Sequence, residues 1–190
     1  ERGLGDALAL ADRVLRSGAL IRCCDVARTP SGSWQLLVGV EDRDRRALAS
    51  LAPWSQREER PLPTRDLGFR TSDALTVRTA APERQLRSIA EAFEGAGAEA
   101  IVVRPALGTA RAAWGSGRIP ELAHLLALLG ELRSRLEPLG GFAVVERMPD
   151  AWRGKVDPWG TPPAAELMRR VKAVYDPGAH FARGRFVAGI

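Results

Sequence analysis

The sequence predicts an α+β fold, a ferredoxin-like antiparallel sheet with helices packed on one face and a C-terminal helix and tail. Two observations lead to this class. Between residues 74 and 147, segments with strand and helix periodicity follow the order strand, helix, strand, strand, helix, strand, which is the order of the split βαβ motif. The 190 residues, 45% of them hydrophobic, are enough to bury a sizeable core.

An N-terminal helix and a hairpin precede this core. Residues Leu4–Arg16 carry apolar side chains at helical spacing. Leu20–Cys24 and Trp34–Val40 are predicted strands, and the turn residues between them indicate a hairpin. We expect a second helix at Glu41–Leu51 and an irregular, proline-containing loop at 53–73. The helix and hairpin can extend the sheet of the core.

The core itself has six predicted elements. Its four strands are expected at Ala74–Thr79, Ala98–Val103, Thr109–Trp114 and Phe142–Arg147. One helix is expected to run from Ala81 to Gly95 with Pro82 as its first helical residue, and a longer, leucine-rich helix from Pro120 to about Leu136.

The last thirty residues hold the most specific pattern. A helix is predicted from Ala164 to Tyr175, and Asp176-Pro177-Gly178 ends it. Its apolar residues form one stripe at helical spacing: Leu167, Met168, Val171, Val174 and Tyr175. The chain then continues through Phe181 to Phe186, with Gly184-Arg185 inside that segment.

This C-terminal sequence resembles the carboxyl end of FAD-linked oxidases of the vanillyl-alcohol-oxidase superfamily, most closely the FAD-binding subunits of glycolate oxidase. In those proteins a helix of the type LMRRLKxxFDP is followed by a turn and xPGRF. The matching residues here are Leu167–Lys172, Tyr175–Pro177 and Gly184–Phe186. Ala182-Arg183 stand where the family often has Asn-Pro. The resemblance covers residues 141–190, and before them only the layout is similar.

The resemblance implies that residues 1–190 form one cap or substrate domain of a flavin-dependent oxidase or dehydrogenase of small 2-hydroxy acids such as glycolate. Its parts would be the N-terminal helix and hairpin at 1–52, the loop at 53–73, the ferredoxin-like core at 74–147, and the C-terminal loop, helix and tail at 148–190. The implied partners are a flavin domain of the same polypeptide and other oxidase subunits. The implied cofactor is FAD, held in a separate amino-terminal domain of the parent protein.

The chain has none of the sequence features needed to hold that cofactor itself. A phosphate loop needs closely spaced glycines between a strand and a helix, and neither GxGxxG nor GxxxxGK[ST] occurs here. We therefore expect no FAD on this chain alone, and no activity without the flavin domain.

Five residues are candidate site residues, and none of them is assigned as the catalytic group. Arg111, in the middle of a strand, would reach a substrate carboxylate from the open sheet face, unless it is only a solvated side chain. His180 lies in the turn near the segment that approaches the flavin in the resembling family, where an imidazole can accept a proton or orient the substrate. Gly184 and Arg185 are expected near the cofactor; alternatively, Arg185 forms a salt bridge or a cap to the preceding helix. Arg104 is a further candidate of the same kind as Arg111.

Composition argues against several other classes. The net charge of +5 comes from arginines spread along the chain, which does not favour nucleic-acid binding. No apolar run approaches about 20 residues, so no membrane span is predicted. Cys23 and Cys24 are the only cysteines and have no histidine cluster near them, so we expect no metal site. A reducing cytoplasm is then the expected compartment.

Two other functions stay open. The first alternative is a free-standing ferredoxin-like module that binds a small molecule or forms an interface between subunits. The second is an RNA-binding sheet, which needs aromatic residues on its central strands, and the candidate strands carry only Phe142, at a strand edge. Trp152 and Trp159 either anchor their loop on the core or contact a flavin domain or partner subunit.

Overall fold

The computed structural model describes residues 3–28, 32–40, 73–162, 164–181 and 187. Within them the strands are β1 (Ile21–Arg28), β2 (Trp34–Val40), β3 (Leu75–Ala80), β4 (Ala100–Arg104), β5 (Thr109–Trp114) and β6 (Phe142–Arg147). The α-helices are α1 (Leu4–Leu15), α3 (Glu83–Gly95), α4 (Leu122–Leu136) and α5 (Ala165–Tyr175). Short 3-10 turns lie at η2 (Pro105–Leu107), η3 (Glu137–Leu139) and η4 (Asp150–Trp152).

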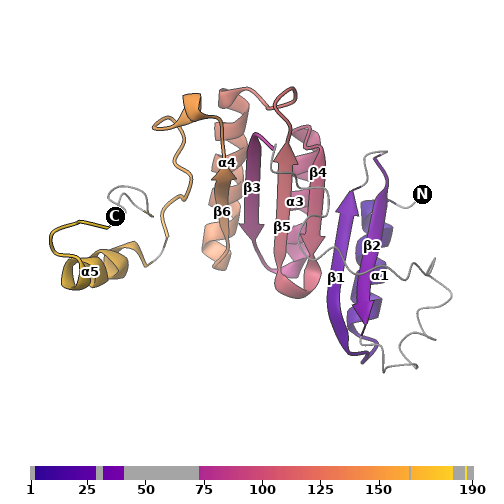
Figure 1. Ribbon diagram of the computed structural model, residues 1–190. Helices are drawn as coiled ribbons and strands as arrows, with labels where there is room; N and C mark the ends of the chain where they lie inside the picture. The colour runs from indigo at the N-terminus through magenta and orange to yellow at the C-terminus, as the bar shows by residue number, and fades with distance from the viewer. Residues whose placement is uncertain (1–2, 29–31, 41–72, 163, 182–186, 188–190) are drawn as a thin grey trace.

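The strands form one open sheet in the order β2-β1-β4-β5-β3-β6, and all neighbouring pairs are antiparallel (Figure 1). The segment from β3 to β6 has the predicted order strand, helix, strand, strand, helix, strand. The N-terminal hairpin extends this sheet, because β1 pairs with β4 through Val26 and Ala27. The predicted α+β, ferredoxin-like fold is therefore confirmed.

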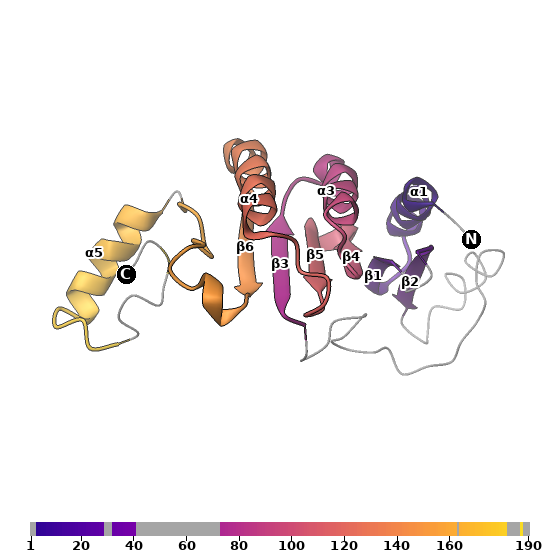
Figure 2. The ribbon, with the colours of Figure 1, turned by 90° about the horizontal axis from the view of Figure 1, so that it is seen from above.

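Three helices cover one face of the sheet. Viewed from above, α1, α3 and α4 lie in one layer on the same side of the strands (Figure 2). They bury a continuous core against the sheet, in which Phe93 of α3 meets Trp114 of β5 edge to face, with ring centroids 6.1 Å apart. The Trp114 indole N–H also donates a 2.9 Å hydrogen bond to the carbonyl of Ala96. On the opposite face of the sheet the described residues form no helix (Figure 2).

Helix α3 shows why the local sequence folds in this way. Its apolar residues Leu86, Ile89, Ala90 and Phe93 recur at helical spacing, and all four are buried. After the helix, Gly97 adopts a φ of 74°, and the N–H of Ala98 bonds back to the carbonyl of Phe93. This is the hydrogen bond of a Schellman motif, which satisfies a carbonyl that the end of the helix leaves open.

The turn between β4 and β5 depends on a glycine. Gly108 has a φ of 61°, in the left-handed region, and it follows the 3-10 turn η2 directly. Its carbonyl accepts a 2.8 Å hydrogen bond from the N–H of Ala81, at the start of the connection to α3. A Cβ atom at Gly108 would lie 2.7 Å from the Ala81 carbonyl oxygen, so a side chain there would clash with backbone.

Several predicted boundaries were wrong for physical reasons. Pro82 is not the first helical residue: its ψ of 145° is extended, and α3 begins at Glu83. Strand β4 begins at Ala100 and not at Ala98, because the Ala98 N–H closes the end of α3. Helix α4 begins at Leu122 and not at Pro120, since Glu121 is still extended with a ψ of 149°. Strand β1 continues beyond Cys24 to Arg28, since β2 and β4 pair with its second half.

Two other sequence predictions concern segments outside the described residues. They are the helix expected at 41–51 and all but the last residue of the loop expected at 53–73.

Candidate functional site

The open face of the sheet carries arginines on three neighbouring strands. Arg78 of β3 and Arg111 of β5 stand directly opposite each other in the register of those strands. Their strand neighbours Val77 and Ala112 belong to the core under the helices, and successive side chains of a strand point to opposite faces. Arg78 and Arg111 therefore lie on the face opposite α1, α3 and α4. Arg104, at the end of β4, lies on the same face as Val102, whose partner in β5 is Arg111.

A single carboxylate bridges the two opposed arginines. Glu146 of β6 places Oε1 2.8 Å from Nε of Arg78, and Oε2 accepts a 2.7 Å hydrogen bond from Nε of Arg111. The Arg78 contact is an ion pair without hydrogen-bond geometry, although that Nε atom is itself buried. The three side chains keep 43%, 34% and 29% of their surface exposed, for Arg78, Arg111 and Glu146 respectively. Part of each of the three side chains is therefore in contact with solvent, whereas the Nε atom of Arg78 is not.

Two further contacts complete the charged face. The Arg78 guanidinium lies 5.3 Å from the centre of the Phe142 ring, within the range of a cation–π interaction. On the other side, Nε of Arg104 lies 3.4 Å from Oδ2 of Asp25 on β1, a mostly buried carboxylate. Among the described residues, the ion pairs across these strands join three arginines to two carboxylates.

The arrangement is suited to binding an anion and not to acid–base chemistry. A guanidinium presents several N–H donors in a fixed plane and does not release its proton at ordinary pH. The two thiols are poor nucleophiles, because burial raises the pKa of Cys24 to about 11 and also raises the pKa of Cys23. Within the described residues no group of three or more His, Cys, Asp or Glu side chains could hold a metal ion.

The structure separates the site residues that the sequence proposed. Arg111 lies on the open face, within the ion-paired cluster. His180 follows α5, and Figures 1 and 2 both show α5 beyond the β6 edge of the sheet, so Arg111 and His180 are not brought together. Gly184 and Arg185 lie outside the described residues.

The turn that carries His180 is organised by Asp176. Its carboxylate accepts hydrogen bonds from the backbone N–H groups of His180 (2.7 Å) and Phe181 (3.1 Å) and from the ammonium of Lys172 (2.7 Å). The Lys172 hydrogen bond is the main reason why the pKa of Asp176 is lowered, and the two backbone N–H groups act in the same direction. Asp176 therefore fixes the direction in which the chain leaves α5.

Sequence reasoning did not identify Arg78 and Glu146. Because neighbouring side chains of a strand point to opposite faces of the sheet, Arg78 and Val77 must lie on different faces. The sequence alone could therefore have predicted the face on which Arg78 lies. Its neighbours could not be read, because only the strand order brings β5 and β6 to the two sides of β3.

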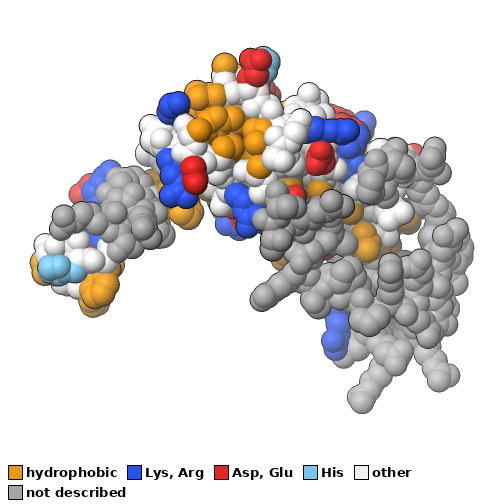
Figure 3. Space-filling view, turned by 45° about the horizontal axis from the view of Figure 1, so that its top comes forward, with side chains coloured by type: hydrophobic (Ala, Val, Ile, Leu, Met, Phe, Trp, Pro, Cys, Tyr) orange, Lys and Arg blue, Asp and Glu red, His pale blue; other side chains and the backbone are white. Residues whose placement is uncertain are grey.

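Helix α5 presents a second surface, which is apolar. Its predicted stripe is largely exposed: Leu167 by 59%, Val171 by 48%, Val174 by 73% and Tyr175 by 82%. Within the helix only Ala165 is buried. In the space-filling view the α5 segment forms a lobe at the lower left with hydrophobic side chains at its surface (Figure 3). An exposed apolar stripe of this kind marks an interaction surface.

The two tryptophans of the preceding loop differ in their surroundings. Trp152 packs against the main core, as expected for a residue that anchors the loop. Trp159 is 37% exposed, and its backbone N–H donates to the carboxylate of Asp157.

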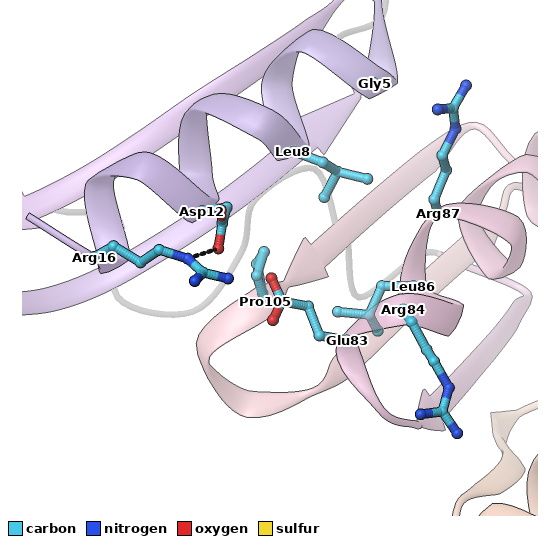
Figure 4. A pocket seen from close by; sticks show the side chains of 9 residues that line it. All are labelled: Gly5, Leu8, Asp12, Arg16, Glu83, Arg84, Leu86, Arg87 and Pro105. Atoms are coloured by element: carbon cyan, nitrogen blue, oxygen red, sulfur yellow. Dashed lines mark hydrogen bonds and ion pairs between the residues drawn. The ribbon is translucent and has the colours of Figure 1, made fainter.

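A cleft of about 380 Å³ lies on the helical side, between α1 and α3 (Figure 4). Leu8, Leu86 and Pro105 line it, while the side chains of Arg84 and Arg87 point away from it (Figure 4). The carboxylate of Asp12, at its rim, accepts a hydrogen bond from Arg16, and the lining contains no histidine, cysteine or hydroxyl side chain. The carboxylates of Asp12 and Glu83 both belong to the lining.

None of the helices in the described ranges has the length and hydropathy required to cross a bilayer. No family model, curated protein or solved structure matches this chain. The residues of the open face and of α5 are therefore the basis for any functional assignment.

Proposed function

We propose that this chain is the cap domain of a flavin-dependent oxidase or dehydrogenase that acts on small 2-hydroxy acids similar to glycolate. In this proposal the open face of the sheet encloses the substrate over a flavin that another domain of the same polypeptide holds. The observation that supports it best is the arginine cluster on that face, built from Arg78, Arg104 and Arg111. Three guanidinium groups on the sheet face opposite α1, α3 and α4 suit a small organic anion.

The role of this chain is to bind and orient the substrate. When bound, FAD supplies the acceptor for the hydride that leaves the α-carbon of the acid. A guanidinium of the cluster holds the substrate carboxylate and thereby fixes the position of that α-carbon. The sheet excludes water from the space that it covers. The chain has no phosphate loop for the cofactor, which is consistent with a flavin bound by a separate domain.

We assign the exposed stripe of α5 to the contact with that flavin domain. Leu167, Val171 and Val174 are apolar, exposed and on one helix face, so a second protein surface can cover them together. The helix also lies within residues 141–190, the region that resembles the oxidases. Cys23 and Cys24 are both free thiols, which is compatible with the reducing cytoplasm as the compartment.

A second candidate is a free-standing module that binds a small anion or joins subunits. The same two surfaces support it, since the arginine face needs no flavin to bind an anion and the α5 stripe suits any apolar partner surface.

The two proposals differ in the spectrum of the protein. We expect protein expressed from the complete gene to be yellow, with the absorbance bands of a bound flavin that bleach when glycolate is added without oxygen. A colourless product that still binds glycolate would favour the free-standing module. The Arg111→Met variant is the matched test of the open face. Its flavin content should be unchanged, while the KM for the acid should rise on the order of 10-fold or more, because a charge-assisted hydrogen bond to the substrate carboxylate is lost.

A further inference from the structure

We propose that Arg133 is a positioning residue: it holds the chain at 157–160 against α4 and β6, and it thereby sets the direction in which α5 leaves the sheet. Because α5 carries the apolar stripe, Arg133 also determines where that surface is presented. The part of this inference that concerns the flavin domain rests on the proposed function, whereas the placement of α5 does not.

Arg133 joins three segments of the chain. It belongs to α4, and its Nε donates a 3.0 Å hydrogen bond to the carbonyl of Ala143 on β6. Its Nη2 donates a 2.8 Å hydrogen bond to the carbonyl of Asp157, in the chain that follows η4. Both acceptors are backbone carbonyls, so these contacts fix the course of the chain, and a planar guanidinium holds two such acceptors in a defined geometry.

The residues after Asp157 are fitted closely to Arg133 and to β6. Gly160 is buried, and a Cβ atom there would lie 2.9 Å from Nε of Arg133, so a side chain would push the guanidinium out of its hydrogen bonds. The carbonyl of Pro158 accepts a 2.7 Å hydrogen bond from the N–H of Val145 on β6. Residues 157–160 are therefore held by both α4 and β6.

Helix α5 follows this segment almost directly. The N–H of Ala165 donates a 3.1 Å hydrogen bond to the carbonyl of Pro162, and only Thr161 separates Pro162 from Gly160. The ring of Pro162 restricts φ, which stiffens the short connection. Within α5 only Ala165 is buried, so the packing of the helix contributes little to its placement. The contacts of Arg133 therefore determine the position of α5 beyond the β6 edge of the sheet (Figures 1 and 2).

The fixed direction of α5 favours docking. A surface that is already held in place loses less conformational entropy when a partner covers it, and it binds more tightly for that reason. In the proposed function this surface is the stripe of α5, and the partner is the flavin domain. Arg133 thus strengthens docking although it belongs to α4.

The test measures the orientation of α5 by residual dipolar couplings of backbone amides, in the 190-residue chain partially aligned in a dilute liquid-crystalline medium. In the wild type the α5 couplings should fit the same alignment tensor as those of α3 and the sheet. In Arg133→Met they should depart from that fit and shrink on the order of twofold, because the helix then samples several directions, while the couplings of α3 and the sheet stay unchanged.

Arg135→Met is the matched control. It removes the same type of side chain from the same helix, and Arg135 forms its ion pair with Glu131 of α4 itself, at 3.7 Å. This variant should leave the α5 couplings at their wild-type values. The loss of a nearby charge on α4 is thereby separated from the loss of the contacts to Ala143 and Asp157.

Three results would each overturn the inference: wild-type α5 couplings that do not fit the tensor of the sheet, α5 couplings unchanged in Arg133→Met, or an equal change in Arg135→Met. A change in the sheet as large as that in α5 would also overturn it, since Arg133 would then serve general stability. If Arg133→Met does not fold, Gly160→Ala takes its place, because its methyl group would displace the guanidinium. Unchanged α5 couplings in Gly160→Ala contradict the inference.

The docking part is tested in protein from the complete gene. Arg133→Met should lower the midpoint of thermal flavin release, and Arg135→Met should not. Equal midpoints in the two variants would contradict a role of Arg133 in docking. Failure of the proposed function gives a different result: the protein then holds no flavin, while the dipolar couplings still report whether Arg133 positions α5.

Discussion

Helices α3 and α5 both carry an apolar stripe, but the stripe of α3 is buried and that of α5 is exposed. Each carries apolar residues at helical spacing along one face. In α3 the residues Leu86, Ile89 and Phe93 are at most 1% exposed, whereas in α5 the stripe residues Val174 and Tyr175 are 73% and 82% exposed. Amphipathic periodicity predicts that a helix forms and which face is apolar. It does not say what covers that face, and for α5 nothing among the described residues does.

The largest expected effect on stability comes from replacing a phenylalanine by alanine in α3, compared with the same replacement next to α5. Phe93→Ala removes a fully buried ring and its edge-to-face contact with Trp114, so we expect a loss of about 3–5 kcal/mol in the free energy of unfolding. Phe181, in the turn after α5, has a ring that is 71% exposed. Phe181→Ala should therefore change the free energy of unfolding by less than about 0.5 kcal/mol. Urea unfolding followed by circular dichroism measures both. Similar losses for the two variants would show that Phe181 is buried in solution and would break the comparison.

A smaller effect is expected when the stripe of α5 is made polar. In protein from the complete gene, Val174→Ser should lower the stability of the docked state by about 2 kcal/mol, since a covered valine would lose its burial. Serine and valine have similar helix propensities, so α5 itself should persist. The measurement is the midpoint of thermal release of the flavin.

Ala173→Ser is the matched control for this experiment, because residue 173 lies on the opposite side of α5 from the stripe. It should leave the midpoint within about 1 °C of wild type, as expected for a surface substitution. If both serine variants shift the midpoint equally, the stripe is not the contact surface.

The smallest effect concerns the turn after α5 and its response to pH. The pKa of Asp176 is lowered in the folded state, so its stabilising contribution is present above its unfolded pKa of about 3.9 and is lost as pH falls through the lower folded value. Titration by NMR should show the amide signals of His180 and Phe181 moving together in acid, below the ordinary range for an aspartate. In Asp176→Asn these shifts should be absent, while the amide signals of α3 stay unchanged in both proteins. A midpoint at or above about 4 would contradict the hydrogen bonds to Asp176.

Sequence patterns were sufficient where structure is local. The bounds of β2, β5 and β6 match the predictions, because each strand is flanked by turn residues or glycines. The start of β4 was wrong, because Ala98 is held by its hydrogen bond to Phe93 at the end of α3, a contact that strand periodicity does not reveal. The exposure of α5 could not be predicted, since it depends on packing and not on periodicity.

The candidate site was predictable only in part. Arg111 was identified because it is a charged residue in the middle of a predicted strand. Its neighbours Arg78 and Glu146 come from strands that are distant in sequence, and they meet Arg111 only through the strand order β5-β3-β6. The proposed function depends on this cluster, of which only Arg111 and Arg104 were candidates from the sequence.

Gly108 has a consequence for tracing distant relatives of this chain. Its left-handed φ and the backbone carbonyl of Ala81 beside it leave no room for a β-carbon. Every amino acid other than glycine would have to displace the junction that leads into α3. We therefore expect distant relatives to keep a glycine between the 3-10 turn η2 and the first residue of β5, even where the surrounding hydrophobic residues differ.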